Sequence, residues 1–125
     1  MNQESLLDYT YERQLVKFPD QTPEQTRRKL CAEIIELQEA RRDYWAAPSK
    51  INAERVKFEE ADVILMANRL WRDSNDPMAW MILDSMYNYE TARYVELKWK
   101  IVEQRVYEKD KDGTYQHCEK NKNNY

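Results

Sequence analysis

Apolar residues recur along most of this chain at the three- and four-residue intervals of an amphipathic helix. The first such segment carries Leu6, Leu7, Tyr11, Leu15 and Phe18 on one stripe. The same periodicity predicts helices over about 4–18, 23 to 44 or 46, 51–71 and 77–107. The last segment exceeds the usual helix length, so a kink or break near 89–91 is expected.

Short polar and proline-containing segments separate these predicted helices. Thr22 is a good N-cap and Pro23 a good first helical residue, so a helix should begin there. Ser49 or Asn52 can cap the next helix, and Ser74–Pro77 again places cap residues before a proline. The breaks therefore support the helix boundaries that the periodicity predicts.

Composition agrees with an all-α fold. Gly113 is the only glycine, and 34% of the 125 residues are charged. A sheet protein needs turn residues at shorter intervals than this chain provides. We expect a four- to five-helix bundle built around an antiparallel hairpin of the helices 23–46 and 51–71. Residues 1–109 would form this domain, and residues 110–125 a polar, mobile tail with a turn at Asp112-Gly113.

Charge and hydropathy exclude several classes of partner. A net charge of −3 argues against binding a nucleic-acid polymer. No apolar run reaches the length of a membrane span, and the first residues do not look like a signal peptide, so a cytoplasmic location is expected. Cys31 and Cys118 do not form a disulfide framework, and the helical position of Cys31 suggests a small buried residue.

Two acidic pairs lie directly beside the apolar stripes of the two helices in the predicted hairpin: Glu33-x-x-Glu36 and Glu59-x-x-Asp62. Residues three apart on a helix share a face, so two packed helices would gather four carboxylates in one space. Such a cluster repels itself unless cations neutralise it, and carboxylate oxygens suit Mg²⁺ or Mn²⁺. The only histidine, His117, falls in the expected tail, which disfavours zinc. The alternative is that these acids are solvated surface charges.

The stretch KLCAEIIE at 29–36, followed by EEAD at 59–62, resembles the metal motif of the all-α nucleoside triphosphate pyrophosphohydrolases, the MazG-like and dimeric dUTPase-like superfamily. The usual form of that motif is K-L-x-E-E-x-x-E followed by E-x-x-D. This chain has Ala32 in place of the first acid. The resemblance implies that Glu33, Glu36, Glu59 and Asp62 are the metal ligands and catalytic carboxylates. It covers about residues 23–71.

The same resemblance implies the activity and the phosphate contacts. A (deoxy)nucleoside triphosphate would be hydrolysed to the monophosphate and pyrophosphate, with water attacking the α-phosphorus and Mg²⁺, or Mn²⁺ in its place, neutralising the phosphates. Lys29 would contact phosphate, or else form an i,i+4 salt bridge with Glu33. Lys98, Lys100 and Arg105 are further candidates for phosphate binding, with plain surface positions as the alternative.

A nucleotide also needs a surface against which its base can stack. Trp71 is a candidate substrate contact, and the other candidates are Phe18, Trp45, Trp80 and Trp99, any of which could instead serve core packing or a subunit interface. Residues 80–106 would contribute to a homodimer or homotetramer. Two other functions stay open: a non-catalytic helical interaction module, and a pyrophosphohydrolase of another nucleotide such as phosphoribosyl-ATP.

Overall fold

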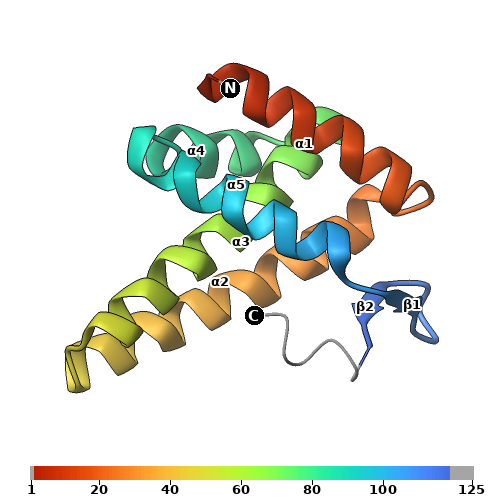
Figure 1. The fold of residues 1–125 in the computed structure, drawn as a ribbon. Helices are drawn as coiled ribbons and strands as arrows, with labels where there is room; N and C mark the ends of the chain where they lie inside the picture. The colour runs from red at the N-terminus through yellow and green to blue at the C-terminus, as the bar shows by residue number, and fades with distance from the viewer. Residues whose placement is uncertain (1, 119–125) are drawn as a thin grey trace.

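A computed structural model describes residues 2–118 of the chain, apart from the side chains of residues 3 and 4. Within that range the chain forms five helices and one small hairpin (Figure 1). The elements are α1 (Gln3–Lys17), α2 (Pro23–Ala46), α3 (Lys50–Ser74), α4 (Pro77–Met86), α5 (Tyr89–Gln104), β1 (Tyr107–Lys109) and β2 (Tyr115–His117). The prediction of a predominantly helical fold is confirmed.

Local capping interactions explain where the helices begin. The side chain of Thr22 accepts a hydrogen bond from the backbone N–H of Gln25, whose side chain in turn binds the backbone N–H of Thr22. Ser49 accepts from the N–H of Asn52, so of the two candidate caps it is Ser49 that begins α3. Such caps satisfy N–H groups that have no partner within the helix.

The long predicted helix 77–107 is interrupted, as expected, but just before residues 89–91. α4 ends at Met86, and the side chain of Asn88 caps the new helix α5 by accepting from the N–H of Thr91. α5 then ends at Gln104, three residues before the predicted end of the helix. Tyr107, expected as the last helical residue, instead begins strand β1.

The core is centred on α3, which carries the longest run of buried residues in the described part of the chain. α2 and α3 lie side by side, joined by the short segment 47–49, and their connected ends extend away from the other helices (Figure 1). The predicted apolar stripes are buried at Leu30 and Leu37 on α2 and at Val63, Ala67 and Leu70 on α3. This packing brings together the two helix faces that lie beside the apolar stripes and carry the acidic pairs.

A buried arginine fixes the connection between α1 and α2. Arg69 of α3 is 2% exposed, and its guanidinium donates to the backbone carbonyls of Gln14, Phe18 and Gln21 at 3.1–3.3 Å. Asp73, one turn later on α3, pairs with the same guanidinium. The arginine therefore ties α3 to the end of α1 and to the turn that follows it, where Phe18 is buried.

Residues expected in a polar, mobile tail instead form part of a folded hairpin. β1 and β2 pair antiparallel, with Tyr107 opposite His117. The Asp110 carboxylate accepts from the backbone N–H groups of Asp112 and Thr114, and Gly113 has a φ of 78°, a conformation that favours glycine. The predicted turn is therefore confirmed, and its role is to join two strands. Residues 119–125 of the expected tail lie outside the described residues.

Two further expectations can be compared with the structure. Cys31 is exposed rather than buried, because it follows the core residue Leu30 and so points to the outer side of α2. None of the helices within residues 2–118 combines the length and the apolar character that crossing a membrane requires.

Candidate functional site

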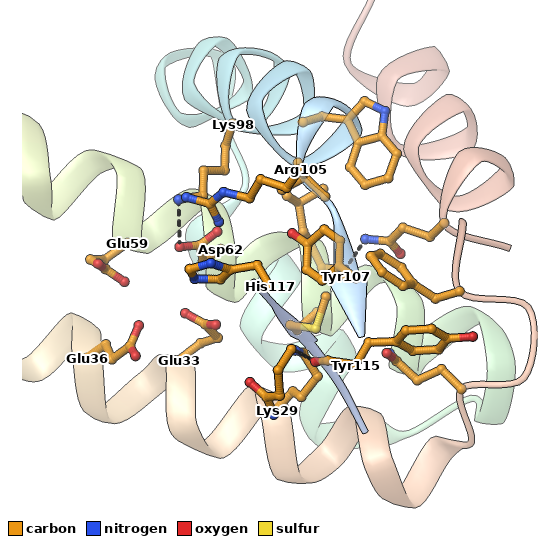
Figure 2. A pocket seen from close by; sticks show the side chains of 18 residues that line it. Lys29, Glu33, Glu36, Glu59, Asp62, Lys98, Arg105, Tyr107, Tyr115 and His117 are labelled. Carbon is orange, nitrogen blue, oxygen red and sulfur yellow. Dashed lines mark hydrogen bonds and ion pairs between the residues drawn. The ribbon is translucent and has the colours of Figure 1, made fainter. Parts of the chain in front are cut away.

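A pocket of about 350 Å³ lies where α2, α3 and α5 meet the hairpin. Figure 2 shows Glu33 and Glu36 rising from α2 toward α3, and Glu59 and Asp62 facing them from α3. Two further chain segments complete its wall, and of their residues only Phe18 was a candidate from the sequence. These are the end of α1 with its following turn, and the hairpin; they contribute Gln14, Phe18, Gln21, Tyr107, Tyr115, Gln116 and His117.

Three of the four predicted acids converge closely. Glu33, Glu59 and Asp62 each offer one carboxylate oxygen, and these three oxygens lie within 4.8 Å of one another. Glu36 also lines the pocket, but it is more exposed and stands outside this tight group. The i,i+3 spacing puts each pair on one face of its helix, and the packing of α2 against α3 turns the two faces toward each other.

Burial, together with repulsion from neighbouring carboxylates, raises the pKa values of three of these acids. Burial, followed by the charges of Asp62 and Glu36, raises the pKa of Glu33 to about 9. Burial and the same two neighbours raise the pKa of Glu59 to about 7. Burial raises the pKa of Asp62 to about 6 although Lys98 and Arg105 act in the opposite direction. The acids are therefore held in an unfavourable arrangement that an added cation would relieve.

Two buried oxygens of this cluster also favour a bound cation. Oε2 of Glu33 and Oε2 of Glu59 are buried without a hydrogen-bond partner among residues 2–118. A buried oxygen without a donor costs about 1–3 kcal/mol, and more when it is charged. Oxygen donors in this number and chemistry fit a hard divalent cation such as Mg²⁺ or Mn²⁺. The residues present thus fit the kind of metal that the sequence predicts.

Cationic side chains border the acids on the α5 side. Nζ of Lys98 lies 3.3 Å from Oδ2 of Asp62, and Lys98 is only 4% exposed. Arg105, just after the end of α5, also lines the pocket (Figure 2). Lys100, the third predicted cation of this region, is exposed and does not line the pocket. Two residues along a helix correspond to a rotation of about 200°, which turns Lys100 away from Lys98.

Lys29 has a partner that neither of its predicted roles includes. Its Nζ donates a 2.7 Å hydrogen bond to the backbone carbonyl of Tyr115 in β2. Burial lowers the pKa of Lys29, while the charges of Glu33 and Asp62 act in the opposite direction. The ammonium group therefore joins α2 to the hairpin at the edge of the acid cluster.

The aromatic wall of the pocket does not include Trp71. Trp71 packs against Trp80, with ring centroids 5.1 Å apart, beside a separate pocket that Leu83 and Tyr87 also line. Nine residues separate Trp71 from Asp62, which places it half a turn round α3 and about 13 Å along its axis. Phe18 and Trp99, two of the other candidates, do line the acid pocket.

Comparisons with protein-family models, with curated proteins and with solved structures find no match for this chain. The pocket geometry and the acidic motif at 29–36 and 59–62 therefore provide the basis for a functional proposal.

Several lining residues were missed by sequence reasoning. Tyr107, Tyr115 and His117 come from the hairpin, whose signal was the Asp112-Gly113 turn between two short segments with aromatic residues. Gln14 lies on the buried side of α1, at 1% exposure, where its Nε2 donates to the Leu65 carbonyl at 3.4 Å. The Oε1 of Gln14 is buried without a partner among the described residues. A glutamine on the apolar stripe of α1 was the available signal.

Proposed function

We propose that this protein hydrolyses a (deoxy)nucleoside triphosphate to the monophosphate and pyrophosphate, using Mg²⁺ or Mn²⁺. One observation carries the proposal: acids from two helices converge with unpartnered buried oxygens, and cationic side chains border them in the same pocket. A polyphosphate chain is the ligand that needs both a metal-binding acid cluster and neighbouring cations. The motif at 29–36 and 59–62 supports the same reaction by resemblance.

Glu33, Glu59 and Asp62 are the residues that would hold the metal, with Glu36 beside them. When bound, a divalent cation neutralises phosphate charge and lowers the pKa of an attached water. The raised pKa values show that these acids lack a nearby positive charge sufficient to keep them ionised. A bound cation would supply that charge and favour their ionised forms.

The other polar side chains of the pocket have separate tasks in this proposal. Lys98 and Arg105 bind the phosphate oxygens on the α5 side. Glu36, which stands outside the tight acid group, accepts the proton of the attacking water. Phe18, Trp99 and Tyr107 form an aromatic wall that faces the nucleoside and limits access of bulk water.

The activity is tested by pyrophosphate release from a panel of nucleoside and deoxynucleoside triphosphates, with and without Mg²⁺. Glu36→Gln and Asp62→Asn should each reduce turnover by about 100-fold or more while leaving the helical content unchanged. Glu39→Gln, an exposed acid on the same helix as Glu36, is the matched control and should retain full turnover. Full activity in both site variants would overturn the assignment. Including phosphoribosyl-ATP in the panel tests the nearest alternative substrate.

We also propose that the protein is a homodimer or homotetramer. α4 exposes several large apolar side chains, and Met78, Trp80 and Met81 are 47%, 49% and 67% exposed. The ring of Trp80 packs against that of Trp71, and both residues line the second pocket beside α4. Exposed apolar residues grouped in this way are typical of a surface that another protein covers.

A further inference from the structure

The hairpin is fastened to the site by polar contacts from α2 and from the turn before it. Lys29 donates to the Tyr115 carbonyl at 2.7 Å, and Gln25 donates to the Asp112 carbonyl at 3.2 Å. The Asp20 carboxylate binds the hydroxyl of Tyr115. These contacts join residues that are 86 to 95 positions apart in the sequence. The hairpin therefore has a definite position relative to the acid cluster.

Aromatic packing fixes the other side of the hairpin. Phe18, 6% exposed, lies with its ring centroid 4.9 Å from that of Tyr107 and 4.9 Å from that of Tyr115. The ring of Tyr107 also lies edge-on to the ring of His117, its partner across the strands, with the ring centroids 6.3 Å apart. Offset and edge-on contacts of this kind hold the rings in definite orientations. His117 is thereby positioned by both strands.

Placed in this way, His117 lines the same pocket as Glu33 and Asp62. In Figure 2 its ring is directed from β2 into that pocket. His117 is exposed, so its ring can be reached from outside. Lys29 binds the backbone carbonyl of Tyr115, two residues before His117 in the same strand. The contact therefore fixes the strand that carries the histidine.

We propose that His117 binds the phosphate chain of the ligand, and that Lys29 acts as a positioning residue by pinning β2 to α2. The inference rests on the proposed function of the pocket as a polyphosphate site. A ring N–H of His117 supplies a hydrogen bond from the hairpin to a phosphate oxygen, in addition to the contacts of Lys98 and Arg105, which line the same pocket. The ammonium group of Lys29, already bound to the Tyr115 carbonyl, acts on the ligand through the hairpin.

The single histidine of the chain makes a direct test possible, because the Hε1 and Hδ2 signals of its ring can be assigned by NMR without ambiguity. The Mg²⁺-loaded protein is titrated with inorganic pyrophosphate, and separately with a non-hydrolysable deoxynucleoside triphosphate analogue. The His117 signal should shift on addition of each ligand, relative to Mg²⁺ alone. An unshifted signal, while other resonances report binding, would overturn the proposal.

A double-mutant cycle tests the role of Lys29. His117→Ala and Lys29→Met should each weaken pyrophosphate binding, and raise KM for a substrate, by about tenfold or more. The double variant should lose little more than either single variant, because both remove the same contact. Effects that add fully would show that Lys29 binds the ligand independently, and would overturn its positioning role. Lys50→Met and Glu108→Gln, exposed positions outside the pocket, are the matched controls.

The results separate this inference from the proposed activity. A shift of the His117 signal on pyrophosphate binding, without turnover of any nucleotide, would support the inference and refute the catalytic proposal. Turnover that is unaffected in His117→Ala, with an unshifted ring signal in the parent protein, would refute the inference alone.

Discussion

The acid cluster makes an unusual prediction for stability, which Glu59→Gln tests most directly. Glu59 is 8% exposed, and burial with the charges of Asp62 and Glu36 raises its pKa from 4.5 to about 7. The folded protein therefore keeps the proton of Glu59 at pH values where the unfolded chain has lost it. Ionisation of this group favours unfolding, so stability from this source falls as the pH rises from about 4.5 to 7.

The free-energy cost of ionising Glu59 follows from the difference between its folded and unfolded pKa values. Each pH unit between the unfolded and folded pKa values is worth about 1.4 kcal/mol, so the cost approaches about 3 kcal/mol at neutral pH and above. The amide of Glu59→Gln removes the charge but leaves a buried N–H donor to be satisfied, which offsets about 1–2 kcal/mol. We expect the metal-free variant to be more stable than the parent protein by about 1–2 kcal/mol at pH 7.5.

The assay is urea unfolding in the presence of a chelator at pH 5.0, 6.5 and 7.5, and then in millimolar Mg²⁺. The advantage of the variant should shrink toward pH 5.0, where Glu59 of the parent protein is protonated in the folded state. Mg²⁺ should stabilise the parent protein more than the variant, because the variant has lost one ligand oxygen. Glu54→Gln, an exposed position on the same helix, should match the parent protein throughout. The reasoning fails if Glu59→Gln is less stable than the parent in chelator and shows the same pH dependence.

Two other predictions concern the fold and the assembly. Arg69→Met should destabilise the protein by about 3–5 kcal/mol in urea unfolding, because it removes three hydrogen bonds to buried carbonyls and the cation that pairs with Asp73. The exposed Arg42→Met should cost less than about 0.5 kcal/mol. Light scattering should show a species of at least twice the 15.3 kDa chain mass, and Trp80→Glu should shift it toward the monomer; a monomer at all concentrations would contradict the proposed dimer surface.

The sequence alone determined the features that depend on neighbours within one or two helical turns. Thr22 and Pro23 start α2 because a cap side chain binds N–H groups two or three residues away. Helical periodicity places four acids directly beside the apolar stripes: Glu33, Glu36, Glu59 and Asp62. The core stripes of α2 and α3 could be predicted for the same reason. Knowing the stripes was enough to predict that the acids would meet.

The tertiary structure alone decided which other side chains join those acids. Lys29 could be placed on the right face of α2, yet its partner Tyr115 lies 86 residues away. Trp71 and Lys100 fit the expected residue types, but the rotation of their helices turns them from the pocket. His117 reaches it because two three-residue strands are held by distant contacts. Such short strands have little stability by themselves. The Asp112-Gly113 turn is a local signal for a hairpin, but only packing against Phe18 and α2 places that hairpin over the acids.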